Sequence, residues 1–117
     1  MLVVDDDRDI RDVLTDALEA EGYRVVTAAD GQEALDWLRK GIARPCVVLL
    51  DLMMPRLDGI QFRTETLKDP ELAALPVVVL SADPTIINTA RSLNFAGSLR
   101  KPVALEALLA AVHAHCD

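Results

Sequence analysis

The sequence predicts an α/β fold in which a five-stranded parallel sheet carries helices on both of its faces. Short apolar runs alternate five times with stretches whose apolar residues recur every three or four positions. The connections are only a few residues long, and strict alternation of this kind requires right-handed crossovers between parallel strands. Because the 117 residues contain no linker, repeat or low-complexity segment, we expect a single domain spanning residues 1–117.

The strands are expected where apolar runs stop at turn residues. The run from Val47 to Leu50 leads straight into Asp51, and its unbroken apolar character is typical of a strand buried on both faces. Residues 76–81 are equally apolar, so these two strands belong in the middle of the sheet. The expected strands are residues 2–4, 23–28, 46–50, 76–81 and 96–100.

The helices are expected between the strands. Apolar residues at i, i+3, i+4, i+7 and i+8 predict an amphipathic first helix that ends at Gly22, and Gly41 ends the second. The apolar positions of the first helix are Ile10, Val13, Leu14, Ala17 and Leu18. The later helices are expected at residues 30–41, about 60–68 and 84–93, with a last helix carrying Leu105, Leu108, Leu109 and Val112.

Composition and charge exclude several classes of function. The formal net charge of −7 argues against direct binding of nucleic acid or anionic lipid. No apolar run approaches the roughly 20 residues of a membrane span, and no signal peptide precedes Asp5. Cys46 and Cys116 are too few and too far apart in sequence to predict a disulfide framework or a zinc site, so a reducing cytoplasm is the expected location. His113 and His115 are expected to face solvent.

Polar residues follow the strands at the point where each strand ends. Asp5, Asp6 and Asp7 follow the first strand, Asp51 and Ser81 end the two central ones, and Lys101 follows the last. The carboxyl ends of parallel strands meet at one edge of the sheet, where open α/β sheets bind their ligands. Several carboxylates placed together repel one another unless a cation lies among them, and Mg²⁺ takes carboxylate oxygens while keeping several waters.

This combination suits a phosphoryl group. A metal ion and Lys101 would neutralise its oxygens, Ser81 would donate a hydrogen bond, and Asp51 would attack the phosphorus. Each residue alone has a plainer interpretation: Asp6 or Asp7 could cap the first helix, Ser81 could be a turn residue, and Lys101 a surface lysine. An Asp directly before Leu-Met-Met-Pro is harder to explain as a turn residue.

The sequence closely resembles the receiver domain of two-component response regulators over essentially its whole length. The matching motifs are Leu-Val-Val-Asp-Asp-Asp, Leu-Asp-Leu-Met-Met-Pro-Arg-Leu-Asp-Gly, Val-Val-Val-Leu-Ser-Ala and Arg-Lys-Pro. The resemblance implies a flavodoxin-like fold with strand order 2-1-3-4-5. It also implies a phosphorelay protein that is not an enzyme in its own right but assists its own phosphorylation and dephosphorylation.

The resemblance assigns a role to each residue of the site. Asp51 is then the phosphoacceptor, Ser81 the switch hydroxyl and Lys101 the phosphate partner, with a cis bond expected between Lys101 and Pro102. Asp5, Asp6, Asp51 and the backbone carbonyl of Met53 would hold Mg²⁺. The phosphoryl donor would be a phosphohistidine on a sensor histidine kinase or a phosphotransfer protein.

The expected output surface departs from the family pattern. Phosphorylation adds roughly −1.5 to −2 charges and three strong acceptor oxygens, which would shift the surface of residues 84–115. That surface would contact an output domain or target protein, or a second copy in a homodimer; no output domain follows in this chain. The aromatic residue usual three positions before the lysine is Ser98 here, so we expect atypical coupling, with Phe95 filling part of the missing ring's space.

Two other functions remain open from the residues. A phosphohydrolase of the haloacid dehalogenase type would use Asp5-x-Asp7, but it needs a further acidic pair after the lysine, where only Glu106 and Asp117 occur. A pseudo-receiver would bind partners without phosphorylation. A nucleotide-binding domain is disfavoured because no glycine pattern matches a dinucleotide or phosphate-binding loop.

Overall fold

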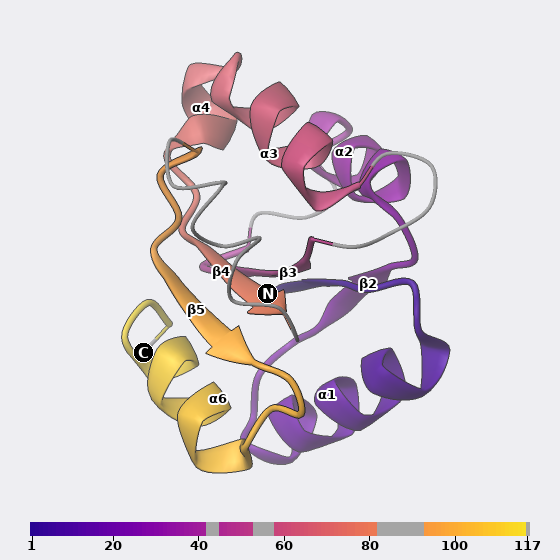
Figure 1. Cartoon of the computed structure of the whole chain (residues 1–117), viewed down its shortest axis with the longest axis vertical. Coiled ribbons are helices and arrows are strands. Elements are labelled where there is room, and N and C mark those ends of the chain that lie inside the picture. The colour runs from indigo at the N-terminus through magenta and orange to yellow at the C-terminus, as the bar shows by residue number, and fades with distance from the viewer. Residues whose placement is uncertain (42–44, 53–57, 82–92, 117) are drawn as a thin grey trace.

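The fold is built on one parallel sheet whose strands lie in the order β2-β1-β3-β4-β5 (Figure 1). This computed structural model describes residues 1–41, 45–52, 58–81 and 93–116. The strands are β1 (Leu2–Val4), β2 (Val26–Ala28), β3 (Val48–Asp51), β4 (Val77–Ser81) and β5 (Gly97–Arg100). Every pair of neighbours is parallel, so the predicted fold class and strand order are confirmed.

Helices cover both faces of this sheet (Figure 1). Those in the described residues are α1 (Arg8–Ala20), α2 (Gly31–Arg39), α3 (Gly59–Leu67), α4 (Pro70–Ala73) and α6 (Leu105–His113). The short α4 was not predicted, although Asp69 caps it and Pro70 opens it, a usual start for a helix. The helix expected at residues 84–93 lies outside the described residues. No helix in the described part of the chain has both the length and the apolar character needed to cross a membrane.

The core is divided by the sheet into two layers because successive side chains of a strand point to opposite faces. On β1, Val4 packs toward α2 and α3 while Val3 packs toward α1 and α6. The central strands repeat the alternation, with Leu50 on the first side and Leu49 on the second. All four residues of β3 are buried, as the unbroken apolar run predicts.

Two apolar side chains that the helical spacing places inward are exposed instead. Val13 on α1 is 67% exposed and Leu105 on α6 is 54% exposed. Both helices pack on the same face of the sheet (Figure 1), and their inward positions are taken by Leu14, Leu18 and Leu108. The periodicity therefore identified the helices correctly but assigned too wide an apolar face to each.

A long charged side chain of α3 is buried in the protein. Arg63 on α3 is 2% exposed, and its guanidinium donates to the backbone carbonyl oxygens of Leu93 at 3.0 Å and Asn94 at 3.3 Å. Burial lowers the pKa of this guanidinium. Asn94 has a positive φ of 57°, which marks a sharp turn just before β5. The hydrogen bonds from Arg63 to the Leu93 and Asn94 carbonyls hold this turn against α3.

The two cysteines form a disulfide, which corrects the sequence-based interpretation. Cys46 precedes β3 and Cys116 follows α6, and their Cα atoms are 5.4 Å apart across a sequence separation of 70. The expectation failed because distance along the chain carries no information about which segments the fold places side by side.

Candidate functional site

The carboxyl ends of four strands bring the predicted residues together. Asp51 is the last residue of β3 and Ser81 the last of β4, and both are buried. Asp5 directly follows β1, and its backbone N–H extends the ladder by donating to the Ala28 carbonyl at 3.1 Å. Lys101 directly follows β5, and its backbone N–H donates to the Ser81 carbonyl at 3.0 Å. Strand pairing thus fixes the backbone of this site.

Three carboxylates gather at this edge of the sheet. Asp5, Asp6 and Asp51 each offer an oxygen, and these atoms all lie within 4.8 Å of one another. Asp5 is 0% exposed and Asp51 is 5% exposed, whereas Asp6 faces solvent. A cluster of hard oxygen donors that is buried on one side and open on the other fits a Mg²⁺ ion, which prefers a few carboxylates and keeps several waters.

Lys101 supplies the positive charge among these carboxylates. Its Nζ donates to Asp5 Oδ2 at 2.9 Å and lies 3.2 Å from Asp51 Oδ2. Burial would by itself lower the pKa of Lys101, but the hydrogen bond and charge of Asp5, joined by those of Asp51, outweigh it and raise the pKa. The lysine is therefore held as a cation beside Asp51. The peptide bond from Lys101 to Pro102 is cis, as predicted.

Asp5 and Asp7 have separate tasks in the loop after β1. The Asp5 Oδ1 accepts from the Asp7 backbone N–H at 2.9 Å, and the Asp5 carbonyl accepts from Arg11 at 2.7 Å. Asp7 is the N-cap of α1, with its side chain accepting from the backbone of Asp9 and Ile10. This matches the capping alternative for Asp7 and leaves Asp6 in the acidic cluster. An Asp5-x-Asp7 pair aimed at one substrate does not fit this geometry.

Gly59 controls how closely α3 approaches the site. A Cβ at this position would lie 2.5 Å from the Asp51 carbonyl oxygen and 2.6 Å from the Leu52 Cα. The Gly59 N–H also donates to the Leu52 carbonyl at 3.3 Å. The start of α3 therefore rests directly against the backbone that carries Asp51, which sequence reasoning did not foresee.

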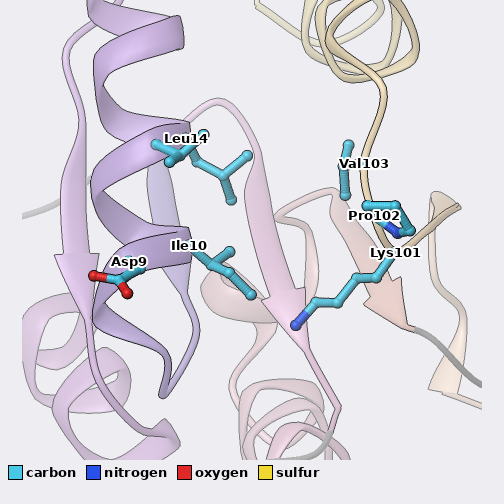
Figure 2. Close-up of a pocket in the computed structure, with 7 residues that line it drawn as sticks. Asp9, Ile10, Leu14, Lys101, Pro102 and Val103 are labelled. Atoms are coloured by element: carbon cyan, nitrogen blue, oxygen red, sulfur yellow. The ribbon is translucent and has the colours of Figure 1, made fainter.

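An apolar pocket of about 290 Å³ lies beside Lys101, between α1 and the segment that joins β5 to α6 (Figure 2). Ile10 and Leu14 of α1 face Pro102 and Val103 across it (Figure 2). The exposed Val13 lines the same pocket. The sequence analysis did not predict this pocket. The apolar face expected for α1 is wider than the sheet can cover, and the uncovered residues of that face line the pocket.

The remaining predicted residues stand as follows. Met53, whose carbonyl was expected to hold Mg²⁺, lies outside the described residues, as do residues 84–92 of the expected output surface. Ser98 is exposed on β5, and Phe95 is half-buried against the core layer of α2 and α3. His113 and His115 are exposed as expected, but the Nδ1 of His113 lies 2.6 Å from the Tyr23 hydroxyl.

Comparison with known proteins gives consistent matches. The family model for the response regulator receiver domain matches residues 1–113. Response regulator MprA of Mycolicibacterium vanbaalenii is 41% identical over 116 residues, covering 97% of this chain and 48% of that protein. Response regulator MprA of Mycobacterium avium is 40% identical, covering 97% of this chain and 49% of that protein. The chain thus spans about half the length of the curated relatives it matches.

Solved structures match over nearly the whole chain. The chemotaxis protein CheY4 of Vibrio cholerae superposes with a TM-score of 0.88 at 32% identity, covering 97% of this chain and 95% of that one. The receiver domain of NtrX from Brucella abortus gives a TM-score of 0.84 at 33% identity, with coverage of 97% and 95%.

Proposed function

This chain belongs to the response regulator receiver domain family of two-component signalling, and we propose that it accepts a phosphoryl group on Asp51. A receiver domain is a signalling module rather than a classical enzyme. The observation that carries the proposal is the position of Asp51, which is 5% exposed at the end of a central strand with Lys101 Nζ 3.2 Å away. A carboxylate placed beside a fixed cation at the mouth of the sheet is suited to attack phosphorus.

The donor in this proposal is a phosphohistidine on a sensor histidine kinase or phosphotransfer protein. A carboxylate oxygen of Asp51 forms a bond to phosphorus as the phosphorus–nitrogen bond breaks, and the leaving imidazole keeps the electron pair and gains a proton. Lys101 and Ser81 then donate to the phosphoryl oxygens, so their interactions differ before and after transfer. Water ends the phosphorylated state when its oxygen attacks the phosphorus: the bond from phosphorus to the Asp51 oxygen breaks, the carboxylate is regenerated, and inorganic phosphate is released.

The magnesium site belongs to the same proposal. Asp5, Asp6 and Asp51 would hold the ion, together with the Met53 carbonyl, and bound Mg²⁺ supplies positive charge that neutralises phosphoryl oxygens. Lys101 already bridges Asp5 and Asp51. Mg²⁺ binding and Lys101 are therefore expected to share the task of balancing the carboxylates.

The pocket beside Lys101 supports a docking position for the phosphodonor protein. It opens between α1 and the β5–α6 segment, and it is lined by Ile10, Leu14 and Val103 (Figure 2). An apolar helix of the donor seated there would bring a histidine toward Asp51, and the exposed Val13 of the pocket would contact that helix.

We further propose a cytoplasmic location, with output through residues 84–115 to a target protein, an output domain or a second copy.

Intact-mass spectrometry tests the phosphoacceptor. With acetyl phosphate and Mg²⁺, the wild-type chain should gain one labile phosphoryl group, and Asp51→Asn should gain none. Asp36→Asn is the matched control because Asp36 is exposed on α2, away from the site, and it should be labelled like the wild type. Failure of the wild type to be labelled would favour the pseudo-receiver; turnover of a phosphate ester that persists in Asp51→Asn and is lost in Asp5→Asn would favour the phosphohydrolase.

A second experiment tests the docking position. Val13→Glu should slow transfer from a histidine kinase that phosphorylates the wild type, yet leave labelling by acetyl phosphate unchanged. Ala20→Glu, an exposed position at the end of the same helix, is the control and should change neither rate. Equal rates of kinase transfer in Val13→Glu and the wild type would contradict donor docking at this pocket.

A further inference from the structure

A disulfide lies at the edge of the sheet opposite the acidic site. Cys46 precedes the amino end of β3 and Cys116 lies beyond the carboxyl end of α6. The Cα separation of 5.4 Å is within the usual range for disulfides, so the backbone on both sides already suits the bond. These are all the cysteines in the chain, so they have no competing partner within it.

The two halves of the disulfide differ in access. Cys46 is exposed, whereas Cys116 is 5% exposed and packs in the core layer of α1 and α6. An attacking thiolate must approach a sulfur from solvent, and of the two residues only Cys46 is exposed. The chemistry is therefore directional, with Cys46 taking the incoming group and Cys116 leaving into a protected position.

The segment around Cys116 is also held by contacts that do not involve sulfur. The Tyr23 hydroxyl donates to the Cys116 carbonyl at 3.1 Å and lies 2.6 Å from His113 Nδ1. The Cys116 backbone N–H donates to the Val112 carbonyl at 2.7 Å. Opening the disulfide therefore leaves the Cys116 thiol near Cys46, where it can form the bond again.

We propose that Cys46–Cys116 is a reversible redox modification site operated by thiol–disulfide exchange. A thiolate of a small thiol or dithiol attacks the Cys46 sulfur, the sulfur–sulfur bond breaks, and Cys116 leaves as a thiolate that takes up a proton. A second thiol then attacks the mixed disulfide, releasing Cys46 as a thiol and the reductant as its own disulfide. A disulfide oxidant such as oxidised glutathione runs the same steps backward. The inference does not depend on the role of Asp51.

Reduction should loosen α6 without reaching the acidic site. The disulfide ties the end of α6 to the start of β3 across a sequence separation of 70. Its loss raises the conformational entropy of the unfolded chain, and this lowers the stability of the fold. The melting temperature is expected to fall by roughly 8 to 15 °C. Backbone amides after Val112 should exchange hydrogen faster, while the acetyl phosphate reaction at the far edge of the sheet keeps its rate.

The test is a titration in glutathione buffers from fully reduced to fully oxidised, followed by acid quenching, alkylation of the unfolded chain and intact-mass spectrometry. Along this series the wild type should pass from two alkylated cysteines to none in a single transition within the glutathione range. A disulfide that stays closed in reduced glutathione and in dithiothreitol would overturn reversibility. Two alkylatable cysteines in oxidised glutathione would overturn the disulfide itself.

Single variants test the direction of attack. In oxidised glutathione, Cys116→Ser should form a mixed disulfide on Cys46, whereas Cys46→Ser should leave Cys116 unmodified because Cys116 is buried. Equal or faster modification of Cys116 would overturn the assigned direction. The double variant Cys46→Ala/Cys116→Ala should melt near the reduced wild type and show no response to the redox buffer; a redox response in that variant would overturn the assignment to these residues.

Discussion

Replacing Gly59 by alanine tests how the acidic site is built. Gly59 is the first residue of α3, and an added Cβ would lie 2.5 Å from the Asp51 carbonyl oxygen and 2.6 Å from the Leu52 Cα. Asp51 ends β3 and Leu52 directly follows it, so both contacts are with backbone atoms that cannot rotate away. A third contact, 3.0 Å from the Leu52 Cδ2, is easier to relieve because a side chain can move.

Two effects of opposite sign decide the outcome. Alanine lowers the conformational entropy of the unfolded chain, which stabilises a protein by about 0.4–1 kcal/mol at a compatible position. Crowding a packed site costs about 1–3 kcal/mol. The backbone contacts at Gly59 place it in the second regime, so Gly59→Ala should lower the free energy of unfolding by about 1–2 kcal/mol and the melting temperature by about 4–8 °C.

Gly97→Ala is the matched control. Gly97 lies on β5 with nothing within 4 Å of an added Cβ and without a positive φ, so alanine there should raise the melting temperature by about 2–4 °C. Thermal and urea unfolding of the two variants give the comparison, and Gly59→Ala should also slow labelling of Asp51 by acetyl phosphate. If Gly59→Ala proved as stable as the wild type, the close approach of α3 to Asp51 would be wrong.

Other substitutions test individual contacts. Arg63→Met should lower the free energy of unfolding by about 2–3 kcal/mol in urea, because buried carbonyl oxygens lose their donor; a stability equal to wild type would refute that role. Asp58→Ala breaks the capping box with Gln61 and should cost about 1 kcal/mol, whereas Asp58→Ser should restore most of it. Lys68 lowers the pKa of Glu65 through a hydrogen bond and its charge, so this contribution is present above pH 4.5 and disappears as pH falls through the lowered pKa. Urea midpoints of Glu65→Gln and wild type should therefore converge in acid and in high salt; a constant difference would contradict the ion pair.

Much of the fold follows from local patterns. The unbroken apolar run before Asp51 predicted a central strand, and all four residues of β3 are buried. Gly22 and Gly41 were expected to end helices, and both have a positive φ just beyond α1 and α2. Exposure was harder to predict. Val13 matched the helical spacing but is 67% exposed, because neighbouring positions of α1 already cover the sheet.

The features that were missed depend on contacts between distant segments. Arg63 was not singled out, because a charged side chain is expected at the surface unless groups inside the protein accept its hydrogen bonds. Its two shorter hydrogen bonds are to carbonyl oxygens about 30 positions later in the chain. Cys46 and Cys116 were left unpaired for the same reason. Asp5, Asp51 and Lys101 were brought together correctly because parallel strands send their carboxyl ends to one edge.

The backbone N–H of Lys101 donates to the Ser81 carbonyl, which holds the two residues side by side. In the proposed function, the side chains of both residues would donate to the phosphoryl oxygens. Strand register ties them further, since Ser81 pairs with Arg100. A displacement of Ser81 at the end of β4 would therefore also displace the start of the β5–α6 segment. A conformational change transmitted through this edge of the sheet would not require an aromatic side chain at position 98, where Ser98 lies.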